Sequence, residues 1–597
     1  MQTAVESKLT VSINGKEFDA RKGETILQLA KRNDINIPTL CNHADLCESG
    51  NCRMCVVEVE GQRVLQASCT TPVAERMVIR TNTRKVRKTR QMIIELLLAE
   101  HVGDCQTCKR NTNCELQDLA AEYGIEEVRF GKSQEKRYEV DTRTPIVRDN
   151  DKCILCRRCT QVCEEIQGVE AIKPMGRGKD TDIGCLFGLP LDETTCVFCG
   201  QCINRCPTGA LTERDATKEV WKAIDDPTKH VVVQTAPAIR AALAEEFDIP
   251  PGERVTGKMA SALKMIGFDT VFDTDFTADL TIIEEGTELL TRLKKALVEK
   301  SQVALPMFTS CSPGWINYIE HYYPDLLPNL STCKSPQQMF GALIKTYYAQ
   351  KKGVDPKNIV SVSVMPCTAK KFEADRPEMY DSGYKDVDHV LTTRELARMI
   401  KQAGIDLMDL QDSEFDDPMG ISTGAAVIFG ATGGVMEAAI RTAYELVTGR
   451  EVPFANLDIR PVRGMEGIRE ASLTITDPLP EWSFLNGAEV KVAIAHSLTK
   501  ARMLMDKVRA GEATYHFIEV MACPGGCLGG GGQPIPTSPE IREKRAQAIY
   551  TEDGAMKLRK SHENPAVKVL YEEFLKEPNG HKSHELLHTK YTPKDTW

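Results

Sequence analysis

The sequence predicts a multidomain protein that joins small α+β domains to a large α/β domain. Its 597 residues exceed the ~100–200 residues of a usual domain, so several hydrophobic cores are expected. Seventeen of the 22 cysteines precede residue 210, whereas strand-like and helix-like segments alternate from about residue 225 onward. We therefore expect metal-dense N-terminal domains followed by an ordinary globular body.

The composition is typical of a globular protein, with 42% apolar residues, 27% charged residues and a net charge of −10. This acidic balance, with both signs interspersed, argues against nucleic acid or an anionic membrane as the main partner. No stretch reaches the ~20 apolar residues of a membrane span, and the N-terminus does not resemble a secretory signal. We expect a cytoplasmic protein, in which cysteines bind metal or react rather than form disulfides.

Residues 1–82 are expected to form a β-grasp ferredoxin. A strand-like segment at 9–13, the hairpin signal Asn14-Gly15 and a helical stretch at 25–30 precede four cysteines with the spacing C-x10-C-x2-C-x13-C. Two thiolates two residues apart on a tight loop suit a 2Fe–2S cluster, and a structural zinc site is the alternative. The predicted ligands are Cys41, Cys52, Cys55 and Cys69.

A histidine and three cysteines follow a basic helix within residues 83–122. Their spacing, H-x3-C-x2-C-x5-C, places one imidazole beside three thiolates within 14 residues, which favours a 4Fe–4S cluster over an isolated structural histidine. An imidazole in place of a thiolate makes a cluster less negative and raises its reduction potential. The predicted ligands are His101, Cys105, Cys108 and Cys114.

Two runs of four cysteines in residues 144–215 predict a ferredoxin with two 4Fe–4S clusters. Both runs have the spacing C-x2-C-x2-C-x3-C, and in such ferredoxins the fourth cysteine of each run crosses to the other cluster. With the two preceding sites they form a series of electron carriers, in which no catalytic base or substrate pocket is predicted. One cluster is assigned to Cys153, Cys156, Cys159 and Cys206, and the other to Cys163, Cys196, Cys199 and Cys202.

Residues 225–540 predict a layered α/β domain with a mainly parallel sheet, and residues 541–597 a short helical tail. Neither GxGxxG nor GxxxxGK[ST] occurs, so no NAD, flavin or nucleotide site is expected. Apolar runs and helical patterns predict strands at 231–235, 270–273, 359–364 and 491–495, and helices at 238–247, 339–350 and 393–403.

The five remaining cysteines lie in or near three distinctive segments. These segments are Thr309-Ser-Cys-Ser-Pro-Gly-Trp315, Met365-Pro-Cys-Thr-Ala-Lys370 and Glu519-Val-Met-Ala-Cys-Pro-Gly-Gly-Cys527. Here the chain resembles the FeFe-hydrogenase family, in the modular form that carries extra iron–sulfur domains. Ala431-Thr-Gly-Gly-Val-Met-Glu437 and the tail from Lys560 to His588 match the same family, so the likeness covers nearly the whole length.

The resemblance implies an H-cluster, which maturation proteins build from a 4Fe–4S cube and a two-iron unit with CO, cyanide and a bridging azadithiolate. The cube ligands of the family correspond to Cys367, Cys523 and Cys527, and Cys527 corresponds to the bridging thiolate. Lys370 corresponds to the lysine that hydrogen-bonds a cyanide. Further residues expected to pack against the cluster are Met365, Met521, Pro237 and Gln337.

One position departs from the family pattern. The first signature of the family usually reads Thr-Ser-Cys-Cys-Pro, and its second cysteine, a cube ligand, is replaced here by Ser312. We expect Cys333 to supply the fourth ligand instead. The alternatives are ligation by the Ser312 oxygen, ligation by Cys311, and a Cys333 that is only a small buried apolar residue.

The function implied by the resemblance is reversible oxidation of dihydrogen to protons and electrons. Cys311 corresponds to the first proton acceptor, and Glu285, Ser331 and Glu288 to a relay toward solvent. Without the resemblance, the glutamates would be interpreted as exposed helix charges. Electrons would pass through the N-terminal clusters to ferredoxin or to flavin- and NAD(P)-binding partner subunits. The alternatives are a hydrogen sensor, an iron–sulfur assembly relative without turnover, and an iron–sulfur subunit of the respiratory complex I type.

Overall fold

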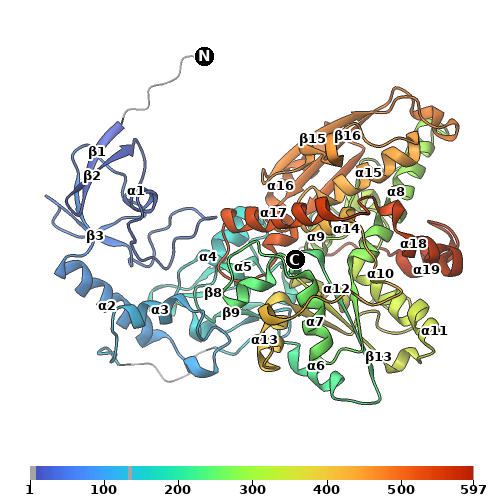
Figure 1. Cartoon of the computed structure of the whole chain (residues 1–597). Coiled ribbons are helices and arrows are strands. Elements are labelled where there is room, and N and C mark those ends of the chain that lie inside the picture. Colours follow the sequence, from blue (N-terminus) through green and yellow to red (C-terminus); the bar gives the residue numbers. More distant parts are fainter. Residues whose placement is uncertain (1–7, 132–137, 596–597) are drawn as a thin grey trace. The chain divides into compact units, whose positions relative to one another are not determined.

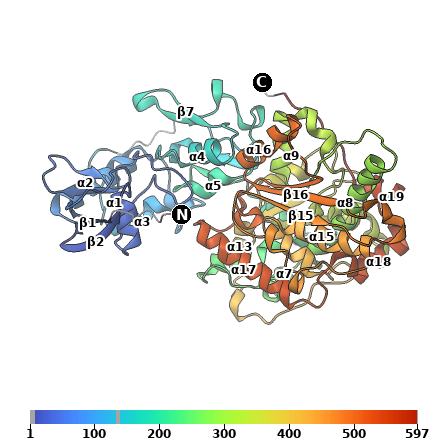
Figure 2. The same cartoon turned by 90° about the horizontal axis from the view of Figure 1, so that it is seen from above.

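The computed structural model describes residues 8–131 and 138–595, and the chain divides into two compact units. Figures 1 and 2 show its elements from two directions, coloured along the sequence. The first unit comprises residues up to 165 together with 170–191 and 205–212, and the second comprises 166–169, 192–204 and all residues from 213 onward. The second unit therefore includes the loop 192–204, which carries three of the predicted cluster cysteines.

The first unit begins with the predicted β-grasp fold, a five-stranded mixed sheet in the order β2-β1-β5-β3-β4. β1 and β2 form a hairpin whose turn residues, Asn14 and Gly15, both have positive φ, as this turn type requires. Helix α1 starts with a capping box at Thr25 and buries its apolar side against the sheet. The bounds are β1 Lys8–Ile13, β2 Lys16–Arg21, α1 Ile26–Arg32, β3 Val56–Val59, β4 Gln66–Ala67 and β5 Val78–Arg80.

The rest of the first unit consists of short elements around cysteine-rich loops. Such loops have little regular structure because bound clusters, rather than a large apolar core, are expected to hold their chain together. The elements of this region are α2 Arg84–Glu100, α3 Glu115–Glu122, β6 Ile146–Arg148, α4 Arg158–Gln161, β7 Lys173–Met175, β8 Asp182–Gly184, α5 Gln201–Arg205 and β9 Leu211–Glu213. The boundary between the two units falls within α5, which begins in the second unit, and within β9, which begins in the first.

The second unit contains a fully parallel four-stranded sheet in the order β11-β10-β13-β14, as the sequence predicts. Helices cover both faces of this sheet. Successive residues of a strand point to opposite faces, so neighbouring residues pack against different helices. Val231 and Val233 pack in the cluster that includes α7 and α13, whereas Val232 packs with α8 and α10. The bounds are β10 His230–Thr235, α7 Thr256–Ile266, β11 Thr270–Asp273, α8 Asp275–Leu297, α10 Pro336–Leu343, β13 Ile359–Met365, β14 His389–Thr392 and α13 Thr393–Gln402.

A second sheet of this unit has the order β12-β17-β16-β15, in which only the β15–β16 pair is antiparallel. Its apolar face packs on α8 and α15. The bounds are β12 Met307–Phe308, α15 Gly434–Thr448, β15 Ile468–Thr474, β16 Glu489–His496 and β17 Phe517–Met521. The other helices are α6 Thr217–Ile224, α9 Pro313–Tyr322, α11 Ala349–Lys352, α12 Ala369–Ala374, α14 Gly424–Val427, α16 Leu498–Arg509, α17 Pro539–Ala555, α18 Pro565–Leu570 and α19 His581–Leu587.

The predicted helix 238–247 is wrong, because the structure has two short 3₁₀ turns there, Pro237–Ile239 and Leu243–Phe247. The carbonyl of Arg240 accepts a hydrogen bond from the backbone N–H of Val255, 15 residues away, instead of a partner within a helix. Tertiary packing has therefore overridden the local pattern. Within the described residues, no helix is long and apolar enough to cross a membrane.

Candidate functional site

A buried cavity of about 80 Å³ lies in the second unit, beside the ends of parallel strands. Its walls include Pro237 after β10, Met365 and Cys367 at the end of β13, and Met521 and Cys523 at the end of β17. In parallel sheets, loops from several strands converge at the carboxyl ends, which is where ligands usually bind. The predicted contact residues Pro237, Gln337, Met365 and Met521 all line this one cavity.

The three cysteines of the second and third signatures, Cys367, Cys523 and Cys527, meet in this cavity. The glycine-rich loop that carries Cys527 makes this possible. A Cβ on Gly530 would lie 2.1 Å from the carbonyl oxygen of Pro366, and Gly526 has a φ of +78°. Only glycine tolerates such close backbone approach and such a conformation, so the loop can fold tightly around the site.

The chemistry of the cavity fits an iron–sulfur group. Burial raises the pKa of the Cys367 and Cys523 thiols, and it raises that of Cys527 to about 12. The Lys370 ammonium opposes the shift at Cys367 and Cys527. Buried thiols with no metal keep their protons, whereas metal binding requires thiolates and releases those protons. Three thiols among apolar walls, with a cation beside them, are suited to hold an anionic iron–sulfur group away from water.

The position of Cys333 argues against the expected ligation. Cys311 and Ser312 line the cavity, and Cys333 is absent from the described residues that line it. Cys333 instead forms an isolated antiparallel bridge with His588 and packs in an apolar cluster with α8 and α10. Ser312 Oγ accepts a hydrogen bond of 3.3 Å from the backbone N–H of Ala522, which also lines the cavity. Backbone pairing with His588 in the C-terminal segment holds Cys333 outside the set of residues that line the cavity.

Lys370 is held at the cavity wall by a buried network. Its Nζ donates hydrogen bonds to the carbonyl oxygen of Cys311 at 3.1 Å and to Glu373 Oε2 at 2.8 Å. Gln337 donates from Nε2 to the same Glu373 oxygen at 3.1 Å, and its Oε1 accepts from Ser363 at 2.9 Å. A buried cation requires such partners. Glu373 was not predicted as a site residue, although its spacing of three residues from Lys370 on α12 was a signal.

The predicted proton-relay residues also lie close together. Glu285 is only 3% exposed, so the interpretation of this residue as an exposed helix charge is wrong. Burial, together with the charge of Glu288, raises the pKa of Glu285 to about 8, and a hydrogen bond to Ser331 opposes the shift. Ser331 Oγ donates to Glu288 Oε2 at 3.0 Å, and Arg292 donates to Glu288 Oε1 at 2.6 Å.

Cys311 lines the cavity and also interacts electrostatically with Glu285. Burial raises the pKa of its thiol well above the ordinary value, and the negative charge of Glu285 adds to the effect. The Lys370 ammonium acts in the opposite direction. A neutral thiol that interacts with a carboxyl group of raised pKa can pass protons without stabilising a permanent charge.

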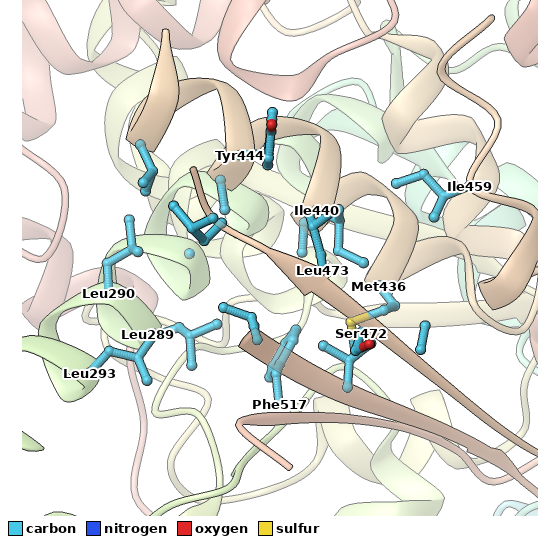
Figure 3. Close-up of a pocket in the computed structure, with 18 of the residues that line it drawn as sticks. Leu289, Leu290, Leu293, Met436, Ile440, Tyr444, Ile459, Ser472, Leu473 and Phe517 are labelled. Atoms are coloured by element: carbon cyan, nitrogen blue, oxygen red, sulfur yellow. The ribbon is translucent and has the colours of Figure 1, made fainter. Parts of the chain in front are cut away.

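A separate apolar cavity of about 140 Å³ borders Glu285. Figure 3 shows side chains of α8, α15, β15 and β17 converging on it, among them Leu289, Met436 and Phe517. Most of the side chains that line this cavity are apolar. The cavity therefore gives Glu285 an apolar surrounding on one side, consistent with its raised pKa.

The first unit brings together the predicted ligands of three accessory sites. In the β-grasp domain, the Sγ atoms of Cys55 and Cys69 are 3.4 Å apart, and Cys41 interacts with Cys52 and Cys69. The second set lines a small cavity beside Lys152, and its members are His101, Cys105, Cys108 and Cys114. The third set lines another cavity, and its members are Cys153, Cys156, Cys159 and Cys206.

The fourth accessory set is divided between the two units. Cys163 belongs to the first unit, and Cys196, Cys199 and Cys202 belong to the second, so their grouping stays a prediction. Cys199 also lines the 80 Å³ cavity with Cys523. This position of Cys199 was not predicted, because nothing in the spacing of the cysteine run relates it to residues more than 300 positions away.

Family comparisons cover most of the chain. Residues 229–531 match the iron only hydrogenase large subunit, C-terminal domain, and residues 539–594 match the iron hydrogenase small subunit. Residues 6–84 match a 2Fe-2S iron-sulfur cluster binding domain. Residues 90–129 match the NADH-ubiquinone oxidoreductase-G iron-sulfur binding region, and residues 144–212 match the ferredoxin-like domain of NADH-quinone oxidoreductase subunit 3.

Similar proteins agree with these matches. The chain is 50% identical to the NADP-reducing hydrogenase subunit HndD of Solidesulfovibrio fructosivorans and 42% identical to iron hydrogenase 1 of Clostridium pasteurianum, each over 98% of this chain and 99% of that protein. A solved FeFe-hydrogenase variant from Chlamydomonas reinhardtii is 47% identical, with a TM-score of 0.57, over 64% of this chain and 100% of that chain. The chain therefore belongs to the iron-only (FeFe) hydrogenase family, and it is a hydrogenase with iron–sulfur domains ahead of its catalytic domain.

Proposed function

We propose that the chain oxidises dihydrogen reversibly at an H-cluster held by Cys367, Cys523 and Cys527. The observation that carries the proposal is the single buried cavity in which these three thiols meet Lys370. When bound, the H-cluster supplies the iron site and the redox chemistry that convert dihydrogen into two protons and two electrons. The protein holds this group, keeps water from it, and separates the protons from the electrons.

The fourth cube ligand is proposed to be the Ser312 oxygen. Ser312 occupies the ligand position of the family signature and lines the cavity, and its Oγ accepts a hydrogen bond from the backbone N–H of Ala522, the residue before Cys523. Ligation by Ser312 leaves the Cys311 thiol available for proton transfer. If this is right, Ser312→Ala lowers the iron content of the cavity, whereas Cys333→Ala retains it. Iron analysis and the infrared spectrum of the matured protein measure both outcomes, and the opposite pattern would reinstate Cys333.

The cluster is expected to carry CO, cyanide and an azadithiolate bridge, and to be assembled by maturation proteins. Lys370 is suited to bind an anionic cyanide, because its ammonium is already fixed at the cavity wall by Cys311 and Glu373. Met365, Met521 and Pro237 line the same space and exclude water from it. These residues preserve the low dielectric in which charge-assisted contacts are strong.

Protons are proposed to move between the cavity and solvent through Cys311, Glu285, Ser331 and Glu288. The Glu285 pKa of about 8 lies close to neutral pH, so this carboxyl group can both accept and give a proton. The Ser331 hydroxyl, hydrogen-bonded to Glu288, supplies the next step. Glu288 is more exposed than Glu285 and is paired with Arg292, which is appropriate for the outer end of the path.

Electrons are proposed to leave through one 2Fe–2S and three accessory 4Fe–4S clusters, with Cys199 as the cluster ligand closest to the catalytic thiols along this route. The NADH-oxidoreductase character of residues 90–129 and 144–212 favours flavin- and NAD(P)-binding partner subunits over free ferredoxin. The proposed domain division is 1–82, 83–122, 144–215, 225–540 and 541–597. A cytoplasmic location is proposed because the cysteine spacings suit metal binding in a reducing compartment.

Two measurements test the proposed function. The matured protein, purified without oxygen, should show infrared bands of CO and cyanide and should reduce a viologen dye under dihydrogen. Iron without those bands, together with no dye reduction, would contradict the proposal and leave an electron-transfer subunit. To identify the partner, candidate flavin subunits and ferredoxin are compared as acceptors at equal concentration, and faster reduction of ferredoxin would overturn the NAD(P) assignment.

A further inference from the structure

Three side chains of metal-binding type meet near the outer end of the proposed proton path. They are Glu288 on α8, Cys333 before α10, and His588 after α19. A carboxylate oxygen, the Sγ atom and an imidazole nitrogen all lie within 4.8 Å of one another. Cys333 and His588 are buried and Glu288 is half-buried. The residues come from three distant parts of the sequence, so no local spacing pattern indicates them.

The backbone holds these residues in place. Cys333 and His588 are paired across an isolated antiparallel bridge. The Cys333 N–H donates to Ser331 Oγ at 3.2 Å, and its carbonyl accepts from Ser310 at 2.7 Å. Glu288 Oε2 accepts from the backbone N–H of Thr332 at 3.0 Å. The side chains of Glu288, Cys333 and His588 are therefore preorganised, and little conformational entropy would be lost when an ion binds to them.

The hydrogen bonds of His588 assign its ring proton to one nitrogen and leave a lone pair on the other. Its Nε2 lies 3.3 Å from Glu284 Oε2, a carboxylate oxygen that also accepts from the backbone N–H of Asn579. A carboxylate oxygen accepts hydrogen bonds, which assigns the ring proton to Nε2. Nδ1 then carries a lone pair, and it lies 2.7 Å from Thr332 Oγ1, the hydroxyl that also approaches Glu288. A histidine that ligates a metal commonly donates its other N–H to a carboxylate in this way.

We infer that Glu288, Cys333 and His588 form a binding site for Zn²⁺. Zinc prefers thiolate sulfur, imidazole nitrogen and carboxylate oxygen in a tetrahedral arrangement, with bonds of about 2.0–2.3 Å. Such bonds bring ligand atoms to roughly 3.5 Å from one another, so the observed separations require only small side-chain adjustments. The Cys333 thiol loses one proton to solvent on binding, and water completes the coordination. Glu284 stays outside the ligand set and orients His588.

Zinc at this site would regulate turnover, and this part of the inference rests on the proposed function. Glu288 is the proposed outer member of the proton relay, and a carboxylate that ligates zinc no longer exchanges protons with Ser331. His584, whose ring centroid lies 4.3 Å from that of His588, is exposed and offers a first contact for a cation arriving from solvent. The site therefore acts as a zinc-sensitive brake on proton exit.

The test uses the full chain with its clusters, purified without oxygen and then equilibrated with ZnCl₂. Bound zinc is counted by mass spectrometry of metals, and dihydrogen oxidation is measured over a range of zinc concentrations. Cys333→Ala and Cys333→Ser remove the thiolate, and Cys185→Ala removes a different buried cysteine as the matched control. Each variant is compared with its own rate in the absence of zinc, so that a change in basal activity does not enter the result.

The wild type and Cys185→Ala are expected to bind one zinc ion more than either Cys333 variant. The zinc concentration that halves turnover should be at least about tenfold lower in the wild type and Cys185→Ala than in the two Cys333 variants. Loss of a residue that only supports a metal ligand already weakens metal binding by about 10–100-fold. Equal zinc counts and equal inhibition in all four proteins would overturn the site. One additional zinc ion that leaves turnover unchanged would establish the site and contradict the relay through Glu288.

Discussion

The first two accessory sites and the catalytic cavity differ in how the chain brings their ligands together. The predicted ligands of each of these two accessory sites lie in one short region of the sequence, from Cys41 to Cys69 and from His101 to Cys114. Cys367 and Cys527, in contrast, are 160 positions apart and meet only because β13 and β17 end beside the same cavity. Local spacing is therefore enough to identify an accessory site, whereas the catalytic site depends on the arrangement of two sheets.

The comparison predicts that the two kinds of site fail independently. Cys527→Ala is expected to lower dihydrogen turnover by more than about 10⁴-fold, because the catalytic group provides most of an enzymatic acceleration that is typically ~10⁶-fold or greater. The electron paramagnetic resonance signals of the accessory clusters should persist. Cys105→Ala is the matched control, which should lose one accessory signal and keep the infrared bands. Loss of all signals in both variants would show that the units do not fold separately.

A substitution in the proposed proton path is expected to lower turnover and to leave the catalytic cluster intact. Glu285→Gln keeps the size of the side chain but removes its acid–base function, and turnover should fall by about 10²–10⁴-fold with unchanged infrared bands. Glu299→Gln, at an exposed position just beyond the end of α8, is the matched control and should retain normal turnover. Near-normal activity of Glu285→Gln would exclude the relay.

The pH at which Glu285 loses its proton tests its buried environment directly. Burial raises its pKa to about 8, so the carboxyl group is mostly protonated at pH 7 and becomes ionised as the pH rises through 8. The infrared band of a protonated carboxyl group should disappear with a midpoint near pH 8 in the wild type. Glu285→Gln should lack this transition. A midpoint near the ordinary value of ~4.3 would show that Glu285 is in contact with water.

The smallest effect is expected at the histidine-ligated accessory site. His101→Cys replaces a neutral imidazole by a thiolate and should lower the reduction potential of that cluster, by on the order of 100 mV in comparison with Rieske centres. Dye-linked turnover should change little, because the catalytic thiols are untouched. A redox titration followed by electron paramagnetic resonance measures the shift. An unchanged potential would indicate that His101 is not a ligand.

Much of the fold followed from local patterns. The strands at 231–235 and 359–364 were predicted because β-branched runs favour buried strands, and the hairpin at Asn14-Gly15 because both residues tolerate positive φ. The segment 238–247 was predicted wrongly as a helix, because a distant backbone N–H takes the carbonyl of Arg240. Propensity describes a segment alone, and this segment is determined by its neighbours.

The sequence by itself predicted the three accessory sets whose members the structure brings together, because metal ligands on one loop follow characteristic spacings. It also determined the membership of Cys367, Cys523 and Cys527 in one centre, through the family signatures. Only the tertiary structure decided that Cys333 pairs with His588 while Ser312 lines the cavity, and that Glu285 is buried. The physical reason is that burial and side-chain direction depend on contacts between segments far apart in the chain, which no local spacing encodes.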